Sequence, residues 1–300
     1  MILIVIILRG NNYDRLGGLL KRCEINIRDP FVLVEDDTYY MYGTRAQNFG
    51  RFVGGVDVYT SKDLENWSEP LECFNSIEFD MNKEVVWAPE VHKYNDAYYM
   101  LVTLTDGMRG TYALKSDSPL GPFKPHSDGK LTPTEWECLD GTLYIENDVP
   151  YLVFCHEHTQ IYDGAMCYIQ LSDDLTHSVG EPVTMFRATD PKWVKVKIPF
   201  KHYITDGPFM FRTKDNVLLM IWSTFINNKY AECVVRFNDG TIKGSFEHIE
   251  PLIDDDGGHG MIFETNNKIY LTYHTPNKTG SEHPAFIELI DHCDSLKKKL

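Results

Sequence analysis

The chain has 300 residues, of which 43% are hydrophobic and 13% are aromatic, so it is long enough to bury a large apolar core. Its 29 Lys and Arg residues are outnumbered by 44 Asp and Glu residues, and the formal charge is −15. A chain this acidic lacks the basic patches that bind nucleic acid or anionic membranes, so we expect neither as a partner. Aromatic side chains together with carboxylates favour a neutral polyhydroxylated ligand such as a sugar.

The first 24 residues form an N-terminal segment that begins with the apolar run "MILIVIIL". This run is too short to span a bilayer, and it lacks the leading positive charge and cleavage site of a signal peptide. We expect residues 1–24 to hold either a strand that closes the fold or an artefact of where the chain starts. The seven cysteines show no C-x-x-C spacing, which favours reduced thiols and a cytoplasmic protein.

Short runs rich in Val, Ile, Tyr, Phe and Thr dominate the rest of the chain and predict β-strands. One such run recurs five times, starting near residues 37, 96, 149, 216 and 267. Each copy follows another strand-like run across an acidic or Asn-rich turn, which is typical of a hairpin. The spacing of roughly 50 to 67 residues is the size of a propeller blade.

We therefore predict an all-β fold, a five-bladed β-propeller with about four antiparallel strands per blade around a central channel. The blades are expected at residues 28–75, 85–133, 138–187, 203–253 and 257–290. They form one domain over residues 25–290, followed by a short charged tail at 291–300. The fifth blade is one strand short in this prediction, and residues 2–8 are the candidate for its missing strand. A β-sandwich, the alternative, would not explain five repeats of blade length.

Acidic residues lie at the start of the first run in three blades. When the second runs are aligned on Tyr39, Pro150, Leu218 and Ile269, the polar residues fall at matching places. Asp29, Asp140 and the basic His259 each precede the aligned residue by ten, and Asp206 precedes it by twelve. Because the innermost strands line the channel, we expect these side chains to converge in one funnel. Asp often caps turns, but like charges brought together destabilise a fold and therefore favour a functional interpretation. Glycoside hydrolysis needs such carboxylates, one to activate water and one to protonate the leaving oxygen.

Five motifs carry a resemblance to a known family: "IRDPFVL", "VVWAPEVHK", "LDGTLYIENDVPYLVF", "TDGPFMF" and "GGHGM". In this order and spacing they closely resemble glycoside hydrolase family 43, over about residues 25–290. The resemblance implies a five-bladed propeller glycosidase that cleaves a xyloside or arabinofuranoside with inversion. It implies an oligosaccharide or small glycoside as substrate and no required cofactor.

The same resemblance implies roles for three aspartates. Asp29 in "RDP" looks like the general base, and Asp140 in "LDG" looks like the residue that orients the acid and adjusts its pKa. The family's general acid is a Glu in "EGP", whereas this chain has Asp206 in "TDGP". Asp is one methylene shorter, and a misplacement of about 1 Å can cost on the order of 10²-fold in rate. Three interpretations remain open: Asp206 is the acid, Glu157 replaces it, or the protein is a non-catalytic propeller that binds sugar.

Further residues are candidates for binding the substrate: Arg28, Trp87, Glu90, Trp222 and His259. The two tryptophans and Phe49 are candidates for stacking on sugar faces, Glu90 for a hydrogen bond to a hydroxyl, and Arg28 for holding the base ionised.

His259 matches a histidine that lies near the channel floor in the family, often beside calcium. Because calcium prefers oxygen ligands, His259 would touch such an ion only through water, and a structural histidine is an equal alternative. The rival enzymes are another propeller-clan hydrolase, such as a fructan-type enzyme, and a glycoside phosphorylase. The phosphorylase needs a cluster of Arg, Lys and His that the motif strands do not show.

Overall fold

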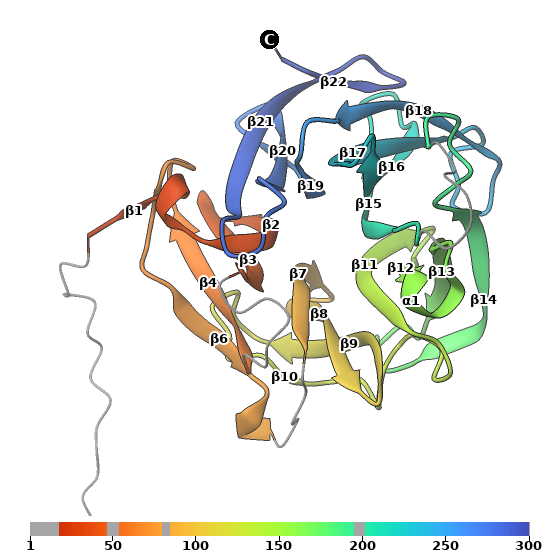
Figure 1. Ribbon diagram of the computed structural model, residues 1–300. Helices are drawn as coiled ribbons and strands as arrows, with labels where there is room; N and C mark the ends of the chain where they lie inside the picture. Colours follow the sequence, from red (N-terminus) through yellow and green to blue (C-terminus); the bar gives the residue numbers. More distant parts are fainter. Residues whose placement is uncertain (1–17, 47–53, 80–84, 195–201, 300) are drawn as a thin grey trace, which may run out of the picture.

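The computed structural model describes residues 18–46, 54–79, 85–194 and 202–299. Within these ranges the chain forms five antiparallel sheets arranged as blades around a common centre (Figure 1). The prediction of an all-β, five-bladed propeller is therefore confirmed. No helix in the described ranges has the length and apolar character needed to cross a membrane.

The blades follow one another along the chain, and each begins with its innermost strand. Blade one holds β2 (Ile27–Glu35), β3 (Thr38–Arg45), β4 (Gly55–Ser61) and β6 (Leu71–Asn75), with the short β1 (Leu20–Lys21) and β5 (Asn66–Trp67) at its outer side. Blade two holds β7 (Val86–Tyr94), β8 (Ala97–Asp106), β9 (Met108–Ser116) and β10 (Lys124–Pro125). Blade three holds β11 (Cys138–Glu146), β12 (Val149–His156), β13 (Ala165–Leu171) and β14 (Ser178–Arg187), with the single-turn helix α1 (His158–Ile161) after β12. Blade four holds β15 (Asp206–Arg212), β16 (Leu218–Ile226), β17 (Lys229–Phe237) and β18 (Phe246–Ile253). Blade five holds β19 (Gly258–Thr265), β20 (Lys268–Thr275), β21 (His283–Asp291) and β22 (Leu296–Lys298).

Two-residue turns fix the register of the inner hairpins. In four blades both turn residues have positive φ: Asp36–Asp37, Asn95–Asp96, Asn147–Asp148 and Asn266–Asn267. Asp and Asn tolerate this left-handed conformation, and such turns match the twist of a hairpin. In blade four the hairpin is longer, because β15 ends at Arg212 and β16 begins at Leu218.

The fifth blade is complete, which corrects the prediction that it is one strand short. Its outer strand β22 pairs with β21, so residues 296–298 of the predicted tail are part of the fifth blade. Residues 2–8, predicted as the missing strand, lie outside the described residues. Leu20 and Lys21 pair with β5 of blade one instead of with blade five. The ring closes where β2 packs against β19 and β20.

Each inner strand carries a β-bulge close to its start, seen as a shift in the ladder register. One residue of each bulge has left-handed φ: Asp29, Ala88, Asp140, Gly207 and His259. A bulge bends the strand and redirects its side chains. Blade four has Gly207 at this place, so the prediction that Asp206 corresponds to Asp29 and Asp140 is wrong by one residue. Asp206 pairs with Ser223 as Arg28 pairs with Thr44, one step nearer the start of the strand.

Candidate active site

The starts of the inner strands surround a cavity of about 370 Å³. Four carboxyl groups line it, from three blades: Asp29, Asp140, Glu157 and Asp206. The predicted residues Arg28, Trp87 and His259 line it as well. The structure thus brings seven of the residues named from sequence into one cavity, together with Arg109 and Tyr230, which the sequence analysis missed.

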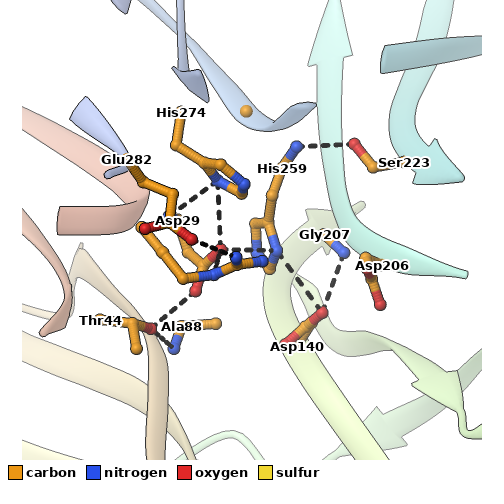
Figure 2. A network of polar contacts seen from close by, with 12 residues as sticks. Asp29, Thr44, Ala88, Asp140, Asp206, Gly207, Ser223, His259, His274 and Glu282 are labelled. Carbon is orange, nitrogen blue, oxygen red and sulfur yellow. Dashed lines mark hydrogen bonds and ion pairs between the residues drawn. The ribbon is translucent and has the colours of Figure 1, made fainter. Parts of the chain in front are cut away.

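Asp29 is nearly buried and is surrounded by groups that stabilise its charge. Thr44 Oγ1 donates a hydrogen bond of 2.7 Å to Asp29 Oδ2, and His259 Nδ1 lies 3.2 Å from Oδ1 (Figure 2). Arg28 Nε lies 3.9 Å from the same oxygen. Burial alone would raise the pKa of Asp29, but the charges of His259 and Arg28 and the Thr44 hydroxyl outweigh it and hold the pKa below its usual range. Asp29 is therefore ionised at neutral pH.

His274 supports Asp29 from blade five. The Asp29 N–H donates to His274 Nδ1 at 3.2 Å, and the His274 side chain is fully buried. Burial lowers the pKa of His274 to about 3, so the ring is neutral and acts as the acceptor. This bond holds the left-handed residue at the start of β2 in place.

Asp140 has the opposite environment. Burial raises its pKa to about 8, and the neighbouring carboxylates Asp206 and Asp29 add to this shift. His259 Nδ1, 3.7 Å from Asp140 Oδ2, and the Gly207 N–H, which donates to the same oxygen at 3.1 Å, oppose it (Figure 2). Asp140 is thus a carboxyl group that retains its proton around neutral pH.

Asp206 lies partly exposed at the start of β15. The hydroxyl of Tyr230 donates to Asp206 Oδ2 at 2.8 Å. Burial raises the pKa of Asp206 to about 6, against the opposing effects of His259 and this hydroxyl. The cavity therefore combines one carboxylate with a depressed pKa and two carboxyl groups with raised pKa values, a division typical of acid and base partners.

His259 joins these carboxyl groups. Burial would lower its pKa, but Asp29, Asp140 and Asp206 raise it to about 9, so the ring is an imidazolium ion. Its backbone N–H donates to Ser223 Oγ at 2.6 Å. The ring therefore supplies a positive charge between the carboxyl groups of blades one and three.

Glu157, the alternative acid, also lines the cavity but is held differently. Arg109 Nη2 lies 2.7 Å from Oε2 and His158 Nε2 lies 3.1 Å from Oε1, while the Thr159 hydroxyl donates to Oε2 at 2.8 Å. These contacts hold both carboxylate oxygens of Glu157 in place. The Arg109 guanidinium also lies 5.8 Å from the centre of the Trp87 ring, which ties this group to the predicted stacking residue.

Two predicted binding residues do not line the cavity. Trp222 is fully buried in the core and packs against Phe186 with ring centres 5.0 Å apart, so its prediction as a stacking residue is wrong. Glu90 is buried beyond the bulge of β7, and its carboxylate contacts His92 Nε2 at 2.9 Å instead of facing the cavity. Phe49 lies outside the described residues.

Arg28 of blade one is held by residues of blade five, where the ring of blades closes. Its Nη1 lies 2.7 Å from Oε1 of Glu282, a fully buried carboxylate, and donates to Asn277 Oδ1 at 3.0 Å. The two cavity arginines, Arg28 and Arg109, are thus both paired with carboxylates. This arrangement differs from the cluster of basic groups that a phosphorylase needs.

The expected calcium site gains no support from these side chains. Among the described residues, no group of three or more His, Cys, Asp or Glu side chains is arranged to hold a metal ion. His259 Nδ1 is directed at two carboxylates, and the oxygen-rich set that calcium prefers is not assembled around it. The calcium ion at the channel floor stays a prediction.

The missed residues differ in how well the sequence could have revealed them. Thr44 lies five residues after Tyr39 and His274 lies five residues after Ile269, the aligned positions of the two second runs, so an alignment of the repeats marks them. Tyr230, Arg109 and Glu282 lie on third strands or in loops, outside the repeated motifs, and no pattern in the sequence singles them out.

A five-bladed propeller whose central cavity holds such a set of carboxyl groups defines a class of glycoside-cleaving enzymes. The family described as Glycosyl hydrolases family 43 matches residues 23–287, and the chain belongs to this family. Its substrates are accordingly carbohydrates, and the protein is a glycosidase.

Known relatives agree with this assignment. The chain is similar to the crystal structure of an endo-arabinase from Bacteroides thetaiotaomicron VPI-5482, with 34% identity, a TM-score of 0.82, and coverage of 91% of this chain and 98% of that one. A thermostable family-43 glycoside hydrolase shares the fold at 23% identity and a TM-score of 0.80, with 96% of each chain covered. A probable arabinan endo-1,5-alpha-L-arabinosidase A from Aspergillus flavus is 21% identical over 292 residues, covering 89% of this chain and 83% of that protein.

Proposed function

We propose that the protein hydrolyses α-L-arabinofuranosyl linkages of the arabinan type with inversion at the anomeric carbon. The observation that carries the proposal is that three aspartates line one cavity in different surroundings, which lower the pKa of Asp29 and raise those of Asp140 and Asp206. The choice of sugar is supported by the similarity to the Bacteroides thetaiotaomicron endo-arabinase. A xyloside, the other pentose substrate considered from sequence, has no such relative among those described above.

In this mechanism Asp29 is the general base. Its ionised carboxylate takes a proton from a water molecule, and the water oxygen attacks the anomeric carbon as the glycosidic C–O bond breaks. Attack from the face opposite the leaving group inverts the configuration. Thr44 and His259 keep Asp29 ionised until the proton arrives.

Asp206 is the general acid and donates its proton to the leaving oxygen. Its raised pKa leaves part of the population protonated near neutral pH, as a donor requires. Asp140 assists, because its carboxyl group lies close to Asp206 and its contact with the neighbouring backbone helps to hold Asp206 in place. Glu157 is less suited to meet the leaving oxygen, because Arg109, His158 and Thr159 already contact both of its carboxylate oxygens.

Leaving-group dependence tests the acid assignment. A nitrophenolate departs with little need for protonation, whereas the alkoxide of an arabinan unit requires it. We expect Asp206→Asn to lower kcat/KM on linear arabinan by about 10²–10⁴-fold and to have a much smaller effect on a dinitrophenyl α-L-arabinofuranoside. Glu157→Gln, the matched control, should affect both substrates alike, and the reversed pattern would assign the acid to Glu157.

Proton NMR of the first-formed sugar tests the stereochemistry, and a substrate panel tests the sugar. We expect the β-anomer of arabinose to appear before mutarotation, and turnover of the arabinofuranoside in preference to nitrophenyl xylosides and galactosides. An α-anomer as first product would exclude inversion. Sugar binding with no turnover of any substrate, and no difference between the wild-type protein and Asp29→Asn, would support the non-catalytic alternative.

A further inference from the structure

A ring of hydrogen bonds links each blade to the next at the bulges of the inner strands. In four cases a side chain on the second strand of one blade accepts the N–H of the left-handed residue of the following blade. Figure 2 shows the bonds at Ala88, His259 and Asp29. The bonds run from Ala88 N to Thr44 Oγ1 at 2.7 Å, from Asp140 N to Thr103 Oγ1 at 2.9 Å, from His259 N to Ser223 Oγ at 2.6 Å, and from Asp29 N to His274 Nδ1 at 3.2 Å. Two hydroxyls of threonine, one of serine and one neutral imidazole thus have the same task.

These acceptors occupy one equivalent position in their strands. Each is the partner of the residue that precedes the bulge, in the pairs Arg28–Thr44, Trp87–Thr103, Asp206–Ser223 and Gly258–His274. In blade three the same position, paired with Leu139, is Cys155. A thiol is a much weaker acceptor than a hydroxyl or an imidazole nitrogen.

Between blades three and four, the bond from the bulge amide has a different acceptor. The Gly207 N–H, which corresponds to the four amides above, donates to Asp140 Oδ2 at 3.1 Å. Cys155 is fully buried beside this contact, with its thiol near the Thr205 hydroxyl. The acceptor here is therefore Asp140, at the bulge of blade three, whereas at the other four places it is a side chain on a second strand.

We propose that Cys155 is a positioning residue, which leaves the Gly207 amide to Asp140 and so fixes the Asp140 carboxyl group next to Asp206. The catalytic meaning of this arrangement rests on the proposed function, while the hydrogen bond itself does not. The backbone at this place requires glycine, because the φ of Gly207 is +49° and a Cβ there would lie 2.6 Å from His259 Cδ2.

The bond also acts on the proton of Asp140. An N–H donor favours the ionised carboxylate, in opposition to burial, which favours the protonated form. The other charged or titratable groups that face Asp140 are Asp29 on β2, Asp206 on β15 and His259 on β19, with the Cys155 thiol on β12. A side chain at residue 155 that competed for the Gly207 amide would remove one of the two groups that favour ionised Asp140.

Substitution of Cys155 tests the proposal, because serine or threonine restores the acceptor found in the other blades. The first readout is the Gly207 amide in ¹H–¹⁵N spectra of glycine-labelled protein. We expect its chemical shift to follow the titration of Asp140 in the wild-type protein and in Cys155→Ala, which adds no acceptor. In Cys155→Ser or Cys155→Thr that titration should be lost. A Gly207 amide that titrates equally in all four proteins would overturn the proposal.

The second readout is the pH dependence of kcat/KM on the arabinofuranoside. We expect the limb that reports Asp140 to move upward by about one pH unit in the serine or threonine variant and to stay in place in Cys155→Ala. Cys167→Ser, a second fully buried cysteine of blade three, controls for a new buried hydroxyl away from the ring. A shift of equal size in Cys155→Ala or Cys167→Ser would show a packing effect and refute the positioning role. If the amide behaves as expected while no substrate is hydrolysed, the proposed function fails and this inference stands.

Discussion

Thr44 is the side chain that connects the proposed base to the ring of inter-blade bonds. Its hydroxyl accepts the Ala88 N–H at 2.7 Å and donates to Asp29 Oδ2 at 2.7 Å, and the residue is 2% exposed. Thr44→Val replaces the hydroxyl by a methyl group of similar shape and keeps a β-branched residue in strand β3. The variant therefore removes two hydrogen bonds with little change in packing.

The cost to stability follows from what is left behind. A hydrogen bond to a charged group is worth about 1.5–3 kcal/mol, and a buried N–H without a partner costs about 1–3 kcal/mol. The two effects share one hydroxyl and are not additive, so we expect the free energy of unfolding to fall by about 2–4 kcal/mol. That is less than the roughly 5–15 kcal/mol of a typical folded domain, and the variant should still fold.

The effect on Asp29 has a definite sign. The folded state lowers the pKa of Asp29 below 3.8, so its contribution to stability is present above that pH and is lost as the pH falls through the folded value. Without the Thr44 hydroxyl the folded pKa rises, and this contribution shrinks. By the proposed mechanism, the acid limb of kcat/KM should move upward by about one pH unit, since 1.36 kcal/mol corresponds to one unit.

Thr103→Val provides a matched control. Thr103 occupies the same position in blade two and accepts the Asp140 N–H at 2.9 Å, but no hydrogen bond joins its hydroxyl to Asp29. Urea unfolding should show a loss of stability in both variants, whereas the Asp29 limb of the pH–rate profile should move in Thr44→Val alone. An unchanged acid limb in Thr44→Val, or an equal shift in both variants, would refute the role assigned to this hydroxyl.

Two further substitutions test the charges around the cavity. His259 has a pKa raised to about 9, so its contribution to stability is complete below about pH 6.5 and is lost as the pH rises through about 9. In urea unfolding, the wild-type protein should lose this stability across that range and His259→Gln should not. The same pH dependence in both proteins would mean that the ring is neutral. Glu282→Gln should remove the 2.7 Å ion pair with Arg28. Steady-state kinetics on the arabinofuranoside should then show a KM raised several-fold with a smaller change in kcat. An equal fall in kcat and kcat/KM would instead place Arg28 in the chemical step.

Repetition made much of this molecule predictable. In most blades ten residues separate the bulge residue of the first strand from the aligned position of the second strand. This spacing alone was enough to predict that Asp29, Asp140 and His259 occupy equivalent positions, and all three lie at bulges. Asp206 was placed one residue off because the inner hairpin of blade four is longer, and sequence alone does not say on which side of a turn an extra residue lies. The strand Leu296–Lys298 was missed because three residues, two of them lysines, carry almost no periodic signal.

Side-chain direction was harder to predict than strand position. Trp222 and Trp87 both lie near the cavity end of strands, yet Trp222 is in the core while Trp87 lines the cavity. Trp222 precedes Ser223, whose hydroxyl joins the inter-blade ring, and neighbouring residues of a strand point to opposite faces. Glu90 follows the bulge of β7, where the alternation is interrupted. The period-two rule thus explains Trp222 once the role of Ser223 is known, and it fails at Glu90 because the bulge is not visible in the sequence.

Asp206 lies one residue before the bulge of its strand, and this position matters because its side chain is shorter than that of a glutamate. Asp29 and Asp140 lie at bulges and share the imidazolium of His259, whereas Asp206 lies a residue earlier and is held by Tyr230 from β17. Burial raises the pKa of Asp206 to about 6 and that of Asp140 to about 8, and the positive charge of His259 opposes both shifts. The Tyr230 hydroxyl also lowers the pKa of Asp206, whereas the charges of Asp206 and Asp29 raise that of Asp140. A glutamate would reach further by one methylene. With the shorter Asp206, the position of the carboxyl group depends more directly on where the backbone beside Gly207 lies. Since the Gly207 N–H donates to Asp140, the residue that we propose assists the acid also holds the backbone next to Asp206.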